Sequence, residues 1–136
     1  MKPKTAQIIF VVLNILSLFA VAYVLYDYIW IKRSITDRVD VIYFDSGIYY
    51  FLLMSVFWWM FAIQYEGLRK AESKFLKHAN QIIIVWFIFM LILANIIPVN
   101  LKNKMQSAGY VKCVDGREIS RVSKGESSFY KLGGCE

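Results

Sequence analysis

The chain has 136 residues, of which 58% are hydrophobic and 17% aromatic, and its mean hydropathy is +0.47. Soluble globular domains contain about 45–50% apolar residues, so this composition excludes an ordinary water-soluble domain. The formal net charge of +6 arises from 16 Lys and Arg against 10 Asp and Glu, which crowd between and after long apolar windows. Because basic residues flank membrane segments and orient them, the positive charge is only a weak indication of nucleic-acid binding.

Three windows are long and apolar enough to cross a membrane: residues 6–31, 47–65 and 81–99. A span needs about 20 apolar residues at 1.5 Å each to cross roughly 30 Å of hydrocarbon. Each peptide group in the hydrocarbon must find a partner within its own segment, so the windows are predicted to be helices. We therefore predict an all-α, three-helix transmembrane domain over residues 1–100.

The first window also has features of a secretory signal peptide. Lys2 and Lys4 give it a basic start, and the Ala-Val-Ala triplet at residues 20–22 is similar to a cleavage site. The apolar run continues well beyond that triplet, which favours a span that is retained.

An odd number of spans places the two termini on opposite sides of the membrane. The count of Lys and Arg alone does not favour a cytoplasmic N-terminus, since more of them lie on the side of the tail. Two observations favour it nevertheless: basic residues are concentrated in the short connector 66–80, and a cysteine pair in the tail suits an oxidising compartment. We expect a bacterial inner-membrane protein with a cytoplasmic N-terminus and a periplasmic tail.

Several polar residues within the spans are candidates for contacts in lipid: Asn14, Ser17, Asp27, Ser55 and Asn95. Asn14 and Ser17 are three residues apart and share a helix face, where hydrogen bonds between helices are the simplest role. Asp27 has two interpretations. An ionisable residue in a span is a candidate proton or ion site. It also lies near the end of its window among Tyr23, Tyr26, Tyr28 and Trp30, and the favoured interpretation is an interfacial residue that reaches headgroups or a loop lysine.

The remaining helical segments contain aromatic residues, one histidine and one proline of interest. Trp58 and Trp59 in the second window either pack against lipid or form an aromatic face for a partner. A lone histidine, His78, does not make a metal site and is expected in a solvated loop. Pro98 is expected to end the third helix, because proline lacks the backbone N–H that a helix interior uses.

The segments outside the spans have the alternation of β-strands. Residues 38–44 in the first loop alternate and are rich in β-branched and aromatic side chains, so we predict a strand that pairs with the tail. Within the tail, residues 101–136, the Asp115-Gly116 pair between β-prone runs predicts a hairpin with arms 111–114 and 117–122. Residues 129–132 are a further candidate strand.

Both cysteines of the chain, Cys113 and Cys135, lie in this tail. A segment so short buries little core, and a cross-link would stabilise it by roughly 3 kcal/mol. Two free thiols are the alternative. The pair is not a CxxC motif and has no nearby histidine to suggest zinc. We predict a Cys113–Cys135 disulfide, and neither a metal nor a cofactor.

The order of the spans, the DVIYFDSG end of the first loop and the tail pattern GYVKC…SRVSKGESSFYKL…C resemble a family of small, uncharacterised enterobacterial inner-membrane proteins. The specific part of the resemblance is limited to the tail: Gly109, Tyr110, Cys113, Ser120, Arg121, Ser123, Tyr130 and Cys135. Several proteins of this size and topology are immunity proteins, encoded beside pore-forming bacteriocins or membrane-targeting type VI secretion toxins. The resemblance therefore implies binding and neutralisation of a protein toxin.

Tyr and Arg are enriched at binding hot spots, so four residues of the tail are candidate toxin contacts: Tyr110, Arg117, Arg121 and Tyr130. An ordinary solvated hairpin with one packed face is an equally good interpretation of them. An accessory subunit of a larger membrane complex is the rival function. An enzyme is the least expected class, because no nucleophile–base pair, metal cluster or phosphate loop is apparent. A transporter is disfavoured by the lack of a charged pathway or an inverted repeat.

Overall fold

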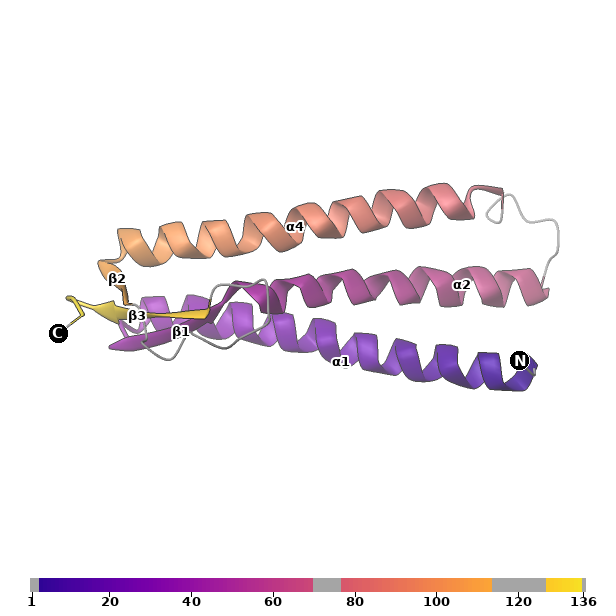
Figure 1. The fold of residues 1–136 in the computed structure, drawn as a ribbon, viewed down its shortest axis with the longest axis horizontal. Coiled ribbons are helices and arrows are strands. Elements are labelled where there is room, and N and C mark those ends of the chain that lie inside the picture. The colour runs from indigo at the N-terminus through magenta and orange to yellow at the C-terminus, as the bar shows by residue number, and fades with distance from the viewer. Residues whose placement is uncertain (1–2, 70–76, 114–126, 136) are drawn as a thin grey trace.

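The computed structural model describes residues 3–69, 77–113 and 127–135. Two long helices, a composite helical segment and a small sheet make up the fold (Figure 1). In chain order the elements are α1 (Pro3–Thr36), β1 (Val41–Asp45), η1 (Ser46–Ser55), α2 (Val56–Arg69), α4 (Ala79–Ser107), β2 (Tyr110–Cys113) and β3 (Ser127–Leu132).

The three predicted spans are confirmed as helices that are long and apolar enough to cross a membrane: Thr5–Thr36, Ser46–Gly67 and Ala79–Ser107. The second span contacts both of the others along its length, whereas α1 and α4 contact each other little. The N-terminus lies at one end of the bundle, and the sheet and the C-terminus lie at the other (Figure 1). At 1.5 Å per residue, α1 is about 50 Å long, which exceeds the roughly 30 Å thickness of bilayer hydrocarbon.

The second span begins as a 3-10 helix, η1, and becomes an α-helix only at Val56. A 3-10 helix has three residues per turn, so side chains three apart lie directly above one another. Tyr49, Leu52 and Ser55 follow that spacing and all three are buried. The start of η1 is fixed by Asp45, whose carboxylate accepts a hydrogen bond of 2.8 Å from the backbone N–H of Gly47. The apolar composition predicted the helix, but the tertiary packing set its pitch.

Pro98 does not end the third helix, so that prediction was wrong. The helix α4 continues through Pro98 to Ser107, and the proline is buried. Proline removes the bond to the carbonyl group four residues earlier, but spans tolerate this loss where a neighbouring helix or a small pitch change compensates. The extra turns matter for the fold, because Leu101 and Met105 are buried residues of the core.

The three strands form one antiparallel sheet in the order β1-β3-β2. The predicted pairing of the first loop with the tail is confirmed, since Val41 to Asp45 of β1 pair with Lys131 to Ser127 of β3. The strand predicted at 129–132 is also confirmed and begins earlier, at Ser127. The predicted Asp115-Gly116 turn and its second arm lie outside the described residues, and the first arm, β2, pairs with β3.

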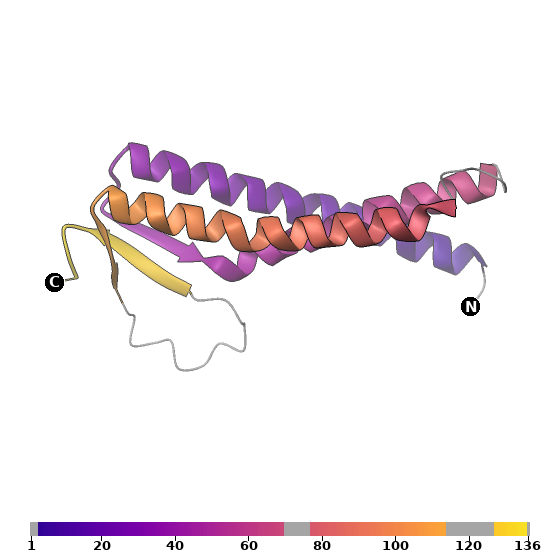
Figure 2. The same cartoon turned by 90° about the horizontal axis from the view of Figure 1, so that it is seen from above.

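The sheet packs against the helices at the end where α1 and α4 finish (Figure 2). Ile42 and Phe44 of β1 alternate inward and are almost fully buried. The ring of Phe44 meets that of Tyr130 edge to face, with 6.1 Å between their centroids. These side chains join Ile31 and Leu101 in one core cluster, so helices and sheet share a single hydrophobic core.

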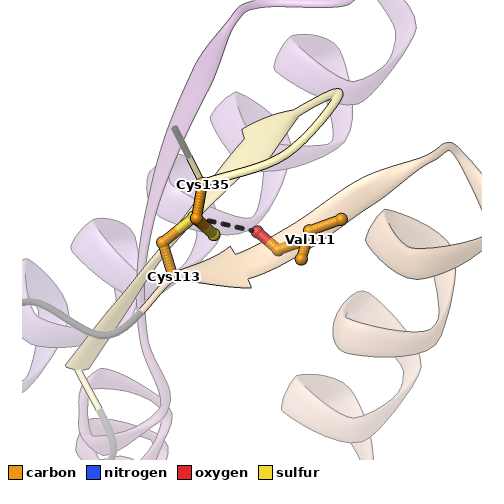
Figure 3. Close-up of a disulfide and its surroundings, with 3 residues drawn as sticks. All are labelled: Val111, Cys113 and Cys135. Atoms are coloured by element: carbon orange, nitrogen blue, oxygen red, sulfur yellow. Dashed lines mark hydrogen bonds between the residues drawn. A yellow bond between two sulfur atoms is a disulfide. The ribbon is translucent and has the colours of Figure 1, made fainter.

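The predicted disulfide is confirmed. Cys113 and Cys135 are bridged, with 5.6 Å between their Cα atoms, so both cysteines of the chain are oxidised (Figure 3). The sulfur of Cys113 lies 3.7 Å from the carbonyl oxygen of Val111. The bridge joins the end of β2, which is an edge strand of the sheet, to the segment after β3. It thus links the C-terminal end of the tail to that edge strand.

Candidate interaction site

Two serines that the sequence placed in the spans accept hydrogen bonds from tryptophans of neighbouring helices. The indole N–H of Trp58 in α2 donates to Ser17 Oγ in α1 at 2.6 Å. The indole N–H of Trp86 in α4 donates to Ser55 Oγ at the end of η1 at 2.9 Å. Both serines are almost fully buried. Each pair satisfies an indole donor inside the bundle, where no water replaces a missing partner.

A second pair of contacts joins η1 to the two long helices nearer the sheet. The Tyr49 hydroxyl donates to a carboxylate oxygen of Asp27 at 3.1 Å, and the Tyr50 hydroxyl donates to Asn95 Oδ1 at 3.1 Å. The amide of Asn95 also donates to the carbonyl of Leu91. Successive tyrosines therefore point in different directions, one toward α1 and one toward α4. The second span is held by side-chain hydrogen bonds on both sides.

Asp27 lies deeper in the protein than the sequence indicated. Because α1 continues to Thr36, Asp27 is more than two turns from the end of its helix. Its carboxylate accepts the hydrogen bond from Tyr49 of the neighbouring span, a contact within the protein that the sequence did not predict. Among the aromatic residues around it, Tyr23 and Tyr26 are exposed as expected of an interfacial belt, whereas Tyr28 packs against the core.

Asn14 differs from the other four polar residues of the spans. Its side-chain amide donates to the carbonyl of Phe10, one turn earlier in the same helix, at 2.9 Å. The backbone carbonyl of Asn14 in turn accepts from the hydroxyl of Ser17 at 2.8 Å. Asn14 thus orients Ser17 for Trp58 through local contacts within α1.

The aromatic pair in the second span is used inside the bundle. The indole N–H of Trp58 donates to Ser17, and the ring of Trp59 meets that of Trp86 edge to face with 5.6 Å between their centroids. Phe61, two residues after this pair, is 41% exposed. His78 is exposed directly before α4. Within residues 3–69, 77–113 and 127–135, no group of His, Cys, Asp and Glu is arranged to hold a metal ion.

Two of the four expected toxin contacts are buried. Tyr110 and Tyr130 are 2% and 1% exposed, and both lie in the core between sheet and helices. The Tyr110 hydroxyl donates to the carbonyl of Val39 at 2.8 Å. Side chains this deeply buried do not suit a partner surface. Their rings pack in the core, and a buried tyrosine hydroxyl usually finds a hydrogen-bond partner, as that of Tyr110 does. Arg117 and Arg121 lie outside the described residues.

Burial also governs the acidity of Tyr110. Removal from water raises the pKa of its phenol above the ordinary value of 10.0, and the nearby Asp40 carboxylate raises it further. Arg38 acts in the opposite direction. The folded tail therefore favours the protonated phenol, which is the form that donates to Val39.

Sequence reasoning missed the opposite face of the sheet, where Tyr43, Val111, Phe129 and Lys131 lie. We call this set the outer sheet face. The register places Tyr43 opposite Phe129 and Val111 opposite Lys131, and directly opposed residues of an antiparallel pair share a face. Tyr43 is 72% exposed and Val111 is 49% exposed. The signal in the sequence was the alternation along β1, in which Ile42 and Phe44 turn inward and Tyr43 outward.

The comparisons with known proteins concern the region that begins at β1 and ends within β3. Residues 41–130 match the family model described as "Protein of unknown function (DUF1240)". The chain belongs to the DUF1240 family. The matched region of this DUF1240 protein starts and ends in two strands that pair with each other, and it includes η1, α2, α4 and β2. No curated protein and no solved structure matches the chain.

Proposed function

We propose that this DUF1240 protein is an integral inner-membrane immunity protein that binds and neutralises a membrane-targeting, pore-forming toxin. The observation that carries the proposal is the outer sheet face, where the exposed ring of Tyr43 lies beside the half-buried ring of Phe129 at one end of the bundle. Tyrosine and other aromatic residues supply large contact area at low entropic cost, and they are enriched where proteins bind one another. A toxin that acts within the membrane meets such a surface as it reaches the bilayer.

The rigidity of this surface supports a binding role. The inner face of the sheet shares one core with α1 and α4, and the disulfide closes the tail. A surface that is already ordered loses little conformational entropy on binding, so more of the contact energy appears as affinity. The bundle supports the same proposal, because its polar side chains pair across helices: Asp27 with Tyr49, Ser17 with Trp58. Such pairs stabilise a scaffold, whereas a transport path needs polar groups that accept a passing solute.

The proposed topology has the N-terminus in the cytoplasm and the sheet in the periplasm. The disulfide supports this orientation, because disulfides persist in oxidising compartments and the bacterial cytoplasm is reducing. A periplasmic sheet would also face a toxin that arrives from outside the cell. The proposed role needs no catalytic chemistry and no cofactor.

The experiment is a competition assay in the native strain. The gene is deleted, and the mutant is grown beside its toxin-producing parent after complementation with wild-type protein, Tyr43→Thr or Tyr65→Thr. Tyr65 is the matched control, since it is 57% exposed but lies near the end of α2, remote from the sheet. We expect wild type and Tyr65→Thr to restore survival and membrane potential, and Tyr43→Thr to restore them poorly.

Survival of the uncomplemented mutant beside a parent with demonstrated toxin activity would contradict the immunity proposal. Equal rescue by both tyrosine variants would retain immunity but remove Tyr43 from the contact. Protein levels in the membrane fraction are measured for each strain, so that a loss of rescue is not confused with a loss of protein.

A role as an accessory subunit of a larger membrane complex is the second candidate. Its support is the exposed apolar surface of the long helices, for example Phe19 at 70% and Val85 at 67% exposure, on which another membrane protein could pack. The same surface suits lipid. Purification from native membranes distinguishes the two candidates, since a subunit co-purifies with stoichiometric membrane proteins in cells that make no toxin.

A further inference from the structure

A groove of about 490 Å³ lies between the last turns of α1 and α4. It is lined by residues of these two helices and by Ala108, which caps α4. The polar side chains of the lining are Lys32, Thr36, Asn100, Asn103, Lys104 and Ser107. None of the roles described above uses this groove.

The polar lining comes from one face of each helix. Asn100, Asn103, Lys104 and Ser107 follow the spacing of three, four and seven residues that aligns side chains along one face of an α-helix. On α1, Lys32 and Thr36 are four residues apart and likewise share a face. The polar faces of the two helices therefore line the same groove, directly after the apolar part of each helix.

The depth of the groove corresponds to the headgroup layer of a bilayer. The apolar windows end at Ile31 in α1 and at Val99 in α4, and the polar lining begins at the next residue of each helix. From Asn100 to Ser107 the helix rises about 10 Å at 1.5 Å per residue. The headgroup and interfacial region on each side of a bilayer is roughly 5–8 Å thick. In a bilayer whose hydrocarbon covers the apolar windows, the groove opens at the level of the lipid phosphates.

The charge of the groove suits an anion. Lys32 and Lys104 contribute two cations from facing helices, and no carboxylate is found among the described residues that line the groove. The carboxylate of Asp37, the residue directly after α1, lies 3.6 Å from the guanidinium of Arg33. The amides of Asn100 and Asn103 and the hydroxyl of Ser107 add neutral hydrogen-bond donors.

We propose that this groove binds the headgroup of an anionic phospholipid, with the phosphate between Lys32 and Lys104. Lysine binds phosphate as a point charge, and asparagine and serine donate hydrogen bonds to phosphate or glycerol oxygens. The acyl chains then lie along the apolar surfaces of α1 and α4. Basic pockets between transmembrane helices recognise anionic headgroups by the same physics. The proposal concerns membrane lipid and does not depend on the immunity function.

A lysine near the C-terminal end of a helix has another use, because it compensates the partial negative charge of the unpaired carbonyl groups; Lys104 lies in the last turn of α4, and Lys32 directly precedes the last turn of α1. That role requires a cation near each helix end, but it does not require the two cations to face a common groove. It also produces no preference among lipids. Lipid selectivity therefore separates the two roles.

The test is native mass spectrometry of the full-length protein released from micelles that contain equal amounts of phosphatidylglycerol and phosphatidylcholine. Three proteins are compared: wild type, Lys32→Gln with Lys104→Gln, and a control with Arg33→Gln and Lys112→Gln. Each variant removes two exposed positive charges at the same end of the bundle, but only the first changes the groove. Intact disulfide and an unchanged unfolding temperature establish that both variants are folded.

We expect wild type and control to retain phosphatidylglycerol preferentially, and the groove variant to lose that preference by on the order of tenfold. Glycerophosphate without acyl chains, added as a competitor, should not displace the lipid. Absence of a preference in wild type, or equal losses in both variants, would overturn the proposal. Displacement by glycerophosphate would assign the groove to a soluble phosphate compound instead. Unchanged lipid selectivity in the groove variant, with loss of a co-purifying protein, would assign it to a protein partner.

Discussion

The indole of Trp58 and the hydroxyl of Ser17 are joined by a 2.6 Å hydrogen bond between α2 and α1. Ser17 donates in turn to the carbonyl of Asn14, so its oxygen is an acceptor for one helix and its proton is used in another contact. This arrangement fixes the rotation of α1 relative to the second span. The buried hydroxyl of Ser17 therefore has a hydrogen-bond partner both as an acceptor and as a donor.

We predict that Ser17→Ala destabilises the bundle, because the indole N–H of Trp58 loses its acceptor in an environment without water. Hydrogen bonds between membrane helices contribute about 0.6 kcal/mol on average and up to about 1.7 kcal/mol. Thermal unfolding in detergent of Ser17→Ala, Trp58→Phe and the double variant gives the coupling between the two side chains. A coupling of zero would show that the contact does not stabilise the fold.

Thr36→Ala is the control for that measurement. The hydroxyl of Thr36 is exposed and donates to the carbonyl of Lys32 in its own helix. Its removal leaves no buried donor unpaired, so the unfolding temperature should stay close to that of the wild type.

We predict that the stability of the tail falls at alkaline pH through Tyr110. The pKa of this phenol is raised in the folded protein, mainly by burial, so folding favours the protonated form. Its contribution is complete below the pKa of the unfolded chain, about 10, and is lost as the pH rises through the higher folded value. Tyr110→Phe removes the titrating group, so its stability should fall less steeply above pH of about 10.

Chemical unfolding at a series of alkaline pH values checks this prediction, with Tyr43→Phe as the exposed control. At neutral pH, Tyr110→Phe should also be less stable by about 0.5–1.5 kcal/mol, since the carbonyl of Val39 loses a donor. Parallel alkaline curves for Tyr110→Phe and wild type would contradict the assigned role of burial.

We predict that Cys113→Ser and Cys135→Ser destabilise the tail equally, because both remove the same bridge. The two cysteines are 22 residues apart, and closing a loop of that size stabilises the folded state by roughly 3 kcal/mol in the chain-entropy model. The double variant should be no less stable than either single variant. Thermal unfolding with the remaining thiol alkylated measures this, and additive losses would mean that the cysteines act separately.

Much of the architecture follows from local properties of the sequence. The positions of the spans depend on the length and polarity of a window, which neighbouring helices do not change. The strands at 38–44 and 129–132 followed from alternation, and the disulfide followed from the need of a short segment for a cross-link. Their boundaries were less predictable: Arg38 has a positive φ of 52° and lies before β1. The helix end predicted at Pro98 was wrong, because proline ends helices in soluble proteins more often than it does in membrane spans.

The candidate site was less predictable than the fold. The sequence drew attention to Tyr110 and Tyr130 by residue type, but strand register turns them inward and turns Tyr43 and Phe129 outward. A shift of one residue in register would exchange the two faces, and nothing local to the tail determines that choice. It depends on which face meets Ile31, Leu101 and Met105.

The sequence alone determined that this is a membrane protein with three helical spans and a cross-linked tail, because hydrophobicity, chain length and cysteine usage act residue by residue. Only the tertiary structure decided which polar groups pair, that η1 adopts a 3-10 pitch, and that two lysines 72 positions apart in the chain face one groove. Those features depend on the relative rotation and depth of helices. Rotation and depth are properties of packing between segments, and no single segment encodes them.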